Sequence, residues 1–362
     1  MTGSVPRGPG FPPFSRSRRA LLGAIAIGVG APLLSACGGS DDDGAGASGG
    51  GVQELTFLSV IPLPNIANSP ELVADASGLF TKHGVKVRFQ NTQGSPPAIQ
   101  TVIAGGALLT KIGDIETITA IVEKNAPLVN LGGVEKEGLL RFLSSKRKPL
   151  QKPEDFRGAM MGLPSSGGTS EKTLDLVLAS AGIKKEEVKR QVVGLAPGVF
   201  ELVKSGRIDG YVVSLDTSLT VLKAEPDAVS FAPSSVLSAG TQLYATSTEQ
   251  AKDTRKQQQI RGFLQAIADA IKLIIDDEAG GFTKTMDLMK RYEVPALKDP
   301  AIAADALREF VKSWTADGRD KLVQMNPQTW KGTYDELVSS GLVAGGKNPS
   351  QWMTTEFSPT SA

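Results

Sequence analysis

The sequence of 362 residues holds a single cysteine, Cys37, and a single histidine, His83. An internal disulfide is therefore excluded, and a chain of this length can bury a sufficient core without one. His83 stands in Lys82-His83-Gly84, a pattern typical of a helix end. No Ser–His–Asp or Cys–His set, Walker loop or Cys/His metal spacing can be found. We expect no catalytic residues, no metal and no cofactor.

An excess of charge of one sign is also missing. The chain has 39 Lys and Arg against 38 Asp and Glu, a net charge of +1. Without residues 1–36, which contain four Arg and no acid, the balance is 35 (39 − 4) to 38, or −3. With no long basic run, the chain lacks the electrostatic pattern of a nucleic-acid-binding protein, and we expect no nucleic-acid partner.

The N-terminus has the pattern of an export signal. Residues 1–19 are rich in Pro, Gly and Arg, and an apolar run then ends at Ala36. That run is short for a membrane-spanning helix, which needs about 20 apolar residues. A basic flank before a short apolar core predicts a signal peptide over residues 1–36. Arg18-Arg19 resembles a twin-arginine signal, with the general secretory route as the alternative.

Leu34-Ser35-Ala36-Cys37 resembles a bacterial lipobox, in which the cysteine is acylated before cleavage. The resemblance implies a lipoprotein with Cys37 as its lipidation site, carrying palmitate or a similar acyl chain. A plain anchor helix with a coincidental cysteine is the alternative. Residues 37–51 are mostly Gly, Ser, Ala and Asp, which predicts a flexible tether. We expect the protein at the extracytoplasmic face of the cell membrane, in the periplasm or at the cell surface.

From Val52 onward, predicted strands alternate with predicted helices, which indicates an α/β fold of two domains. The pattern runs from a strand at 55–60 to one at 128–131, and restarts after Asp155. The lobes are predicted at residues 52–145 and 146–235, with residues 236–362 returning to the first lobe and ending in helices. The hinges are expected near residues 142–150 and 231–242.

Ligands of open α/β sheets bind at the carboxyl ends of the strands, so the loops there are candidate sites. The segment 165–170 can offer backbone N–H groups to an anion or carbonyl, with an ordinary helix cap as the alternative. Glu116 and Asp216 are predicted at strand ends. There they would favour a ligand with N–H, O–H or positive charge, unless they are solvated surface acids.

Four short motifs follow one another in the folded part. They are Ala76 to Phe80 before Gly84-Val85-Lys86-Val87, Lys152 to Gly158, Ala181-Gly182-Ile183, and Gly206 to Gly210. Their order and spacing resemble the solute-binding proteins of ABC importers, most of all the family that binds nitrate, sulfonates, taurine and thiamine-pyrimidine precursors. The resemblance implies a two-lobed periplasmic-binding-protein-like fold of type II, each lobe a mainly parallel sheet flanked by helices.

The resemblance also implies which residues line the ligand. By position these are Pro62, Leu63, Asn65, Gly94, Ser95, Glu116, Thr117, Ser165, Ser166, Gly167, Gly168, Thr169, Ser214 and Asp216. No arginine stands among them to hold a sulfonate or nitrate, and the two acids disfavour a bare anion.

The function that the resemblance implies is capture of a small organic molecule by a monomeric protein. The two lobes would close on this ligand and deliver it to an ABC permease and its ATPase. Two alternatives stay open: an enzyme of the thiamine-pyrimidine-precursor type on the same fold, and a ligand-sensing lipoprotein.

Overall fold

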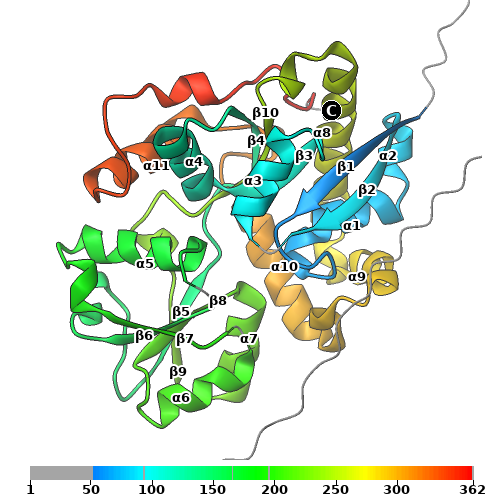
Figure 1. The fold of residues 1–362 in the computed structure, drawn as a ribbon. Coiled ribbons are helices and arrows are strands. Elements are labelled where there is room, and N and C mark those ends of the chain that lie inside the picture. Colours follow the sequence, from blue (N-terminus) through cyan, green and yellow to red (C-terminus); the bar gives the residue numbers. More distant parts are fainter. Residues whose placement is uncertain (1–51, 93, 165, 195, 361–362) are drawn as a thin grey trace, which may run out of the picture. The chain divides into compact units, whose positions relative to one another are not determined.

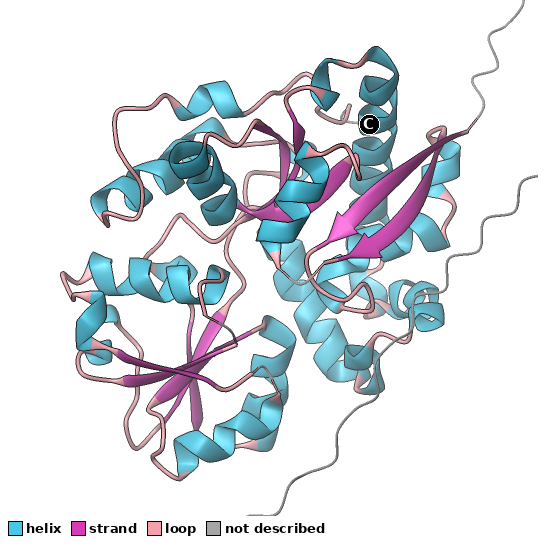
Figure 2. Cartoon of the chain, viewed as in Figure 1, coloured by secondary structure: helices cyan, strands magenta, loops and turns pink. Residues whose placement is uncertain are grey.

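The computed structural model describes residues 52–92, 94–164, 166–194 and 196–360 (Figure 1). Cys37 and the predicted signal peptide and tether lie outside these residues, as does Ser165. Within the described part, helices flank two separate five-stranded sheets (Figure 2). The α/β, two-lobed fold expected from the sequence is confirmed.

The first sheet has the strand order β2-β1-β3-β10-β4. Its strands are β1 (Gln53–Ser59), β2 (Val85–Asn91), β3 (Leu109–Gly113), β4 (Leu128–Glu135) and β10 (Gln242–Ser247). The helices between them are α1 (Ser69–Ala76), α2 (Leu79–Lys82), α3 (Ser95–Ile103) and α4 (Asp114–Lys124). Strand β1 runs parallel to β2 and β3, whereas β10 is antiparallel to both of its neighbours, so four strands share one direction.

The second sheet has the order β7-β6-β8-β5-β9. Its strands are β5 (Arg141–Ser145), β6 (Met160–Leu163), β7 (Lys189–Val192), β8 (Gly210–Val213) and β9 (Ala228–Phe231). Its helices are α5 (Thr169–Ser180), α6 (Phe200–Lys204) and α7 (Leu215–Ala224). Here β5 is the antiparallel strand, and four strands again share one direction.

Strand β5 was not predicted from the sequence, and its residues lie in the segment 52–145 that was assigned to the first lobe. Its residues pair with β8 and β9, so the boundary expected after residue 145, and the hinge expected at 142–150, fall inside the second sheet. The period-two pattern of a strand does not say which sheet the strand joins, and the partners β8 and β9 begin 65 (210 − 145) and 83 (228 − 145) residues after β5 ends.

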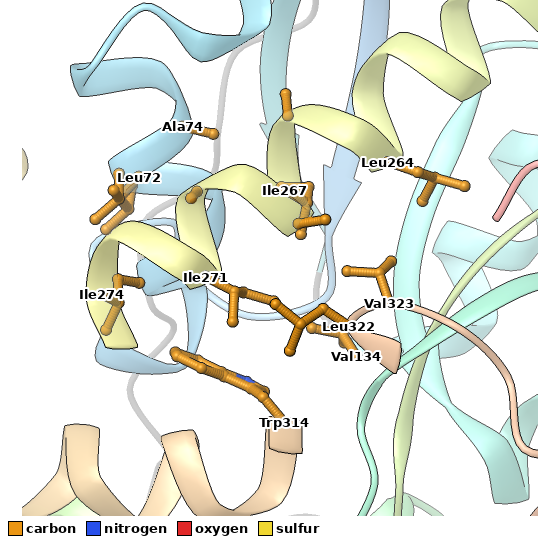
Figure 3. Close-up of a cluster of buried hydrophobic side chains, with 14 of the residues drawn as sticks. Leu72, Ala74, Val134, Leu264, Ile267, Ile271, Ile274, Trp314, Leu322 and Val323 are labelled. Carbon is orange, nitrogen blue, oxygen red and sulfur yellow. The ribbon is translucent and has the colours of Figure 1, made fainter. Parts of the chain in front are cut away.

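The C-terminal part returns to the first sheet as α8 (Thr254–Asp276), α9 (Thr283–Met289), α10 (Pro300–Thr315) and α11 (Pro327–Ser339). Phe263 of α8 stacks on Phe57 of β1 and on Phe80 of α2, with ring centroids 5.2 and 5.3 Å apart. Figure 3 shows buried side chains of α8, where Ile271 and Ile274 lie near Trp314 of α10. Each such side chain stabilises the fold by about 1.5–3 kcal/mol. Among the described helices, none combines the length and apolar character that a membrane span requires.

Candidate functional site

Two connections join the sheets, residues 136–140 from β4 to β5 and residues 232–241 from β9 to β10. Because β5 and β10 are antiparallel to their neighbours, each connection leaves the carboxyl edge of one sheet and reaches the carboxyl edge of the other. The carboxyl edges of both sheets therefore border the region that these two connections cross. Ligands of open α/β sheets bind at such edges.

The two sheets repeat one topology around this region. In each sheet three neighbouring strands run parallel, β2-β1-β3 in the first sheet and β7-β6-β8 in the second. The antiparallel strand follows a connection between the sheets: β10 follows residues 232–241, and β5 follows residues 136–140. Glu116 and Asp216 were predicted at strand ends, but they lie in the first turns of α4 and α7, which follow β3 and β8 directly. Strand β3 ends at Gly113 and β8 at Val213, so each acid lies three residues beyond its strand, at corresponding points of the two sheets.

Glu116 is the most unusual of the predicted residues. Its side chain is 6% exposed, and neither carboxylate oxygen has a hydrogen-bond partner among the described residues. A buried polar group without a partner costs about 1–3 kcal/mol, and more when it is charged. A ligand that donates hydrogen bonds to the two oxygens of Glu116 would explain why they have no partner in the described residues.

The backbone beneath Glu116 leaves room for this carboxylate. Gly113 has an ordinary extended conformation, with φ −72° and ψ 150°, so glycine is not needed there for its conformational freedom. A Cβ atom at Gly113 would instead clash with Oε2 of Glu116. Thr117, one residue on, donates its hydroxyl to the Gly113 carbonyl at 2.7 Å and so stabilises the first turn of α4.

Two further polar side chains lie on the same face of the first sheet. Gln242 pairs with Gly113 on one side and with Glu135 on the other, and paired residues of an antiparallel ladder point to one face. The Nε2 atom of Gln242 lies 3.8 Å from the position of a Cβ at Gly113. Glu135 is 7% exposed, and its burial raises its pKa to about 7 although Lys111 opposes the shift.

Deeper on this face, Lys111 is fully engaged. Its Nζ lies 2.9 Å from Oε1 of Glu71 and donates to the Ala67 carbonyl at 2.8 Å. Tyr244 donates its hydroxyl to the same Glu71 oxygen at 2.7 Å. This buried lysine and one carboxylate neutralise each other, so Lys111 does not offset the acids Glu116 and Glu135 at the edge of the sheet.

Sequence reasoning missed Lys111, Glu71, Glu135 and Gln242. One signal was available, because Leu109-Thr110-Lys111-Ile112 places a lysine inside a buried strand, where charges occur mainly when they are paired. The partner Glu71 lies 40 residues away in the chain, and Gln242 comes from the returning strand β10.

The loop after β1 builds its own structure. Asn65 accepts from the backbone N–H of Ala67 at 2.9 Å, and so caps the short 3-10 helix η1 (Ile66–Asn68). The carbonyls of Pro62 and Leu63 accept from the side-chain amide of Asn68, each at 3.2 Å. The Oδ1 atom of Asn68, a buried residue that the sequence did not single out, has no partner among the described residues.

The turn after β2 is tied to the first strand. Gly94 adopts a φ of +86°, a conformation that favours glycine, and donates its N–H to the Val60 carbonyl at 3.0 Å. Ser95 begins α3 and is 6% exposed. Both predicted residues therefore lie at the carboxyl edge of the first sheet.

The loop expected to bind an anion already holds an acid of the chain. The N–H of Gly167 donates to the carboxylate of Glu171, and this bond is the main cause that lowers the pKa of Glu171. Arg190 pairs with Glu171 at 2.9 Å. Gly168 caps α5, Thr169 begins it, and Ser166 is exposed. The described part of this loop therefore resembles an ordinary helix start more than an anion cradle.

In the second sheet, Ser214 precedes α7 and donates its hydroxyl to that of Thr217 at 3.1 Å. Asp216 is half-buried. In the described part of the chain, no three His, Cys, Asp or Glu residues are grouped so that they could hold a metal ion.

This architecture is the periplasmic binding protein fold. The aliphatic sulphonate-binding protein SsuA of Escherichia coli superposes with a TM-score of 0.64 at 17% identity, over 83% of this chain and 97% of that one. The nitrate-binding protein NrtA of Synechocystis PCC 6803 gives a TM-score of 0.64 at 12% identity, over 84% and 87%.

The NMT1/THI5-like family matches residues 65–279, and the chain belongs to this family. A curated relative, the riboflavin-binding protein RibY of Chloroflexus aurantiacus, is 22% identical over 315 residues, which cover 85% of this chain and 87% of the relative. The fold also carries enzymes, since the desulfurization enzyme DSZB matches with a TM-score of 0.51 at 14% identity.

Proposed function

We propose that this protein is the extracytoplasmic solute-binding component of an ABC importer. It captures a small organic molecule between its two lobes, as a monomer, and delivers it to a permease and its ATPase. The observation that carries the proposal is the arrangement of the site: two carboxyl edges meet at the interlobe connections, and one of them presents the buried, unpartnered carboxylate of Glu116. The family and the binding proteins of this fold support it.

The proposal includes export and a lipid anchor at Cys37. The lipobox-like Leu34-Ser35-Ala36-Cys37 supports it, together with the periplasmic location stated for SsuA and NrtA. A lipid on Cys37 would keep the binding protein near its permease. Cys37→Ala should therefore release the protein from membranes into the soluble fraction while its ligand affinity stays unchanged; a variant that stays membrane-bound contradicts the anchor.

We propose binding without catalysis. The only histidine, His83, lies 2.9 Å from Asp269 of α8, on an element that does not reach the carboxyl edges. Around Glu116 the structure offers carboxylates and an amide, with Lys111 already paired. Thr117, beside Glu116, donates its hydroxyl to the Gly113 carbonyl, and the binding proteins of this fold support recognition rather than turnover.

Ligand binding can be tested on the purified protein by thermal denaturation. A ligand at 100 times its Kd stabilises the native state by about 2.7 kcal/mol, which raises the melting temperature by several degrees. Riboflavin, named for the curated relative, is the first compound to test, followed by a panel of amines, N-heterocycles, sulfonates and nitrate. Stabilisation by one compound supports the proposal, and no stabilisation by any of them contradicts it.

A further inference from the structure

The charges at the edge of the first sheet restrict the chemistry of the ligand. Glu116 and Glu135 are both more than nine-tenths buried on one face of the sheet. Gln242 lies on β10, between β3, which leads into the helix of Glu116, and β4, which carries Glu135. The nearby cation, Lys111, is paired with Glu71 and the Ala67 carbonyl. A ligand at this edge therefore meets two acids that Lys111 does not neutralise, of which Glu135, with its pKa raised to about 7 by burial, is only partly ionised at neutral pH.

An ionised carboxylate only accepts hydrogen bonds. A ligand that satisfies the two oxygens of Glu116 must bring N–H or O–H donors, and a positive charge would add Coulombic attraction in this poorly solvated site. A sulfonate or nitrate presents acceptors and a negative charge, so it would leave both oxygens unpartnered and add repulsion.

The position of Glu116 on α4 suits this role. It lies in the first turn, where the helix dipole stabilises a negative charge without a counter-ion. Gly113 leaves space for the carboxylate to lie over the end of β3. The fold therefore makes room for the carboxylate, while its hydrogen-bonding capacity stays unused among the described residues.

We propose that Glu116 orients the ligand and that the ligand is a small nitrogen compound, a protonated amine or amidine or an N–H heterocycle, which donates to the Glu116 carboxylate. Gln242 lies beside this contact, and Glu135 lies on the far side of Gln242. This inference rests on the proposed function and specifies the ligand of the same site.

The experiment measures affinities of the wild type and of single variants by calorimetry. Donor probes are benzamidine, 2-aminopyridine and riboflavin, and anionic probes are benzenesulfonate and nitrate. Glu116→Gln keeps the size of the side chain but removes its charge, and Gly113→Ala displaces the carboxylate. The control is Glu186→Gln, which changes an exposed acid of the second lobe. Circular dichroism and the melting temperature of the ligand-free variants report on folding.

At least one donor probe should bind the wild type, and Glu116→Gln should weaken that binding ten- to hundredfold, the equivalent of one or two charge-assisted hydrogen bonds. Gly113→Ala should also weaken it, and Glu186→Gln should leave it unchanged. Glu116→Gln should not lower the melting temperature of the ligand-free protein, because the carboxylate has no hydrogen-bond partner to lose in the part of the chain that the structure describes. A purely structural acid would lower it.

Other outcomes separate this inference from the proposed function. Binding of benzenesulfonate or nitrate alone, equally to the wild type and to Glu116→Gln, overturns the inference while capture of a solute stands. Binding of a donor probe that Glu116→Gln does not weaken also overturns it. No binding by any probe, or by the wider panel above, contradicts both.

Discussion

Asp114 and Thr333 lie 219 residues apart in the sequence, yet the Thr333 hydroxyl donates to Oδ2 of Asp114 at 2.9 Å. The same carboxylate accepts from the backbone N–H of Gly240 at 3.0 Å and from the Thr241 hydroxyl at 2.8 Å. One buried side chain at the start of α4 thus joins α11 and the connection that leads into β10. This anchor fixes one end of an interlobe connection to the first lobe.

Loss of Asp114 should therefore destabilise the fold. Asp114→Ala leaves four donors, the N–H groups of Ile115 and Gly240 and the hydroxyls of Thr241 and Thr333, without this acceptor. We expect a loss of about 3 kcal/mol in the free energy of unfolding by urea. Thr333→Val removes only one donor, and should cost about 1 kcal/mol. Equal effects of the two substitutions would show that Asp114 does not act as a shared anchor.

The raised pKa of Glu135 predicts how the stability of the fold depends on pH. Its folded pKa of about 7 lies above the ordinary value of 4.5, mainly because of burial. Lys111 lowers this pKa, Glu71 raises it, and Tyr244 faces the same group. The folded state binds more protons than the unfolded state between these values, so the contribution of Glu135 to stability falls as pH rises from about 4.5 to 7. Its full size is on the order of 3 kcal/mol.

Glu135→Gln removes this titration. We expect the variant to match the wild type at pH 4, below both pKa values, and to exceed it by up to about 3 kcal/mol at pH 8. Urea unfolding at the two pH values measures the difference. Asp114, whose burial raises its pKa to about 6, keeps its own pH dependence in both proteins. A stability difference that is the same at pH 4 and pH 8 would contradict the assignment.

The order of strands and helices was predictable because alternation, caps and breaks are local properties of the sequence. For example, Ser69-Pro70-Glu71 is typical of the N-terminus of a helix, and α1 begins at Ser69. The sheet that receives β5, in contrast, is decided by partners that come much later in the chain. Glu116 was found because it is an acid beside a buried strand, but its lack of a partner is visible only in three dimensions.

The pair of Lys111 and Glu71 should behave as a unit. Lys111→Met leaves Glu71 buried without its cation, and breaking a buried pair in this way costs about 3–5 kcal/mol. The double variant Lys111→Met/Glu71→Gln keeps an acceptor for Tyr244 and should recover most of that loss. Urea unfolding of the two single variants and the double variant gives the coupling energy. Additive effects would show that the two charges do not depend on each other.

Two helix glycines predict opposite effects of the same substitution. Alanine favours a helix over glycine by about 1 kcal/mol. At Gly262 of α8, however, a Cβ would lie 2.5 Å from the His83 carbonyl oxygen and 3.1 Å from a methyl group of Val85. Backbone cannot move aside as a side chain can, so Gly262→Ala should destabilise the protein by about 1–3 kcal/mol despite the gain in helix propensity.

Gly332 of α11 is the matched control. A Cβ there would meet only the Ser238 side chain, at 3.5 Å, which is an ordinary contact distance. Gly332→Ala should therefore raise the free energy of unfolding by up to about 1 kcal/mol. Because both glycines lie inside helices, a stabilising Gly262→Ala would mean that α8 does not approach the end of α2 as closely as the backbone places it.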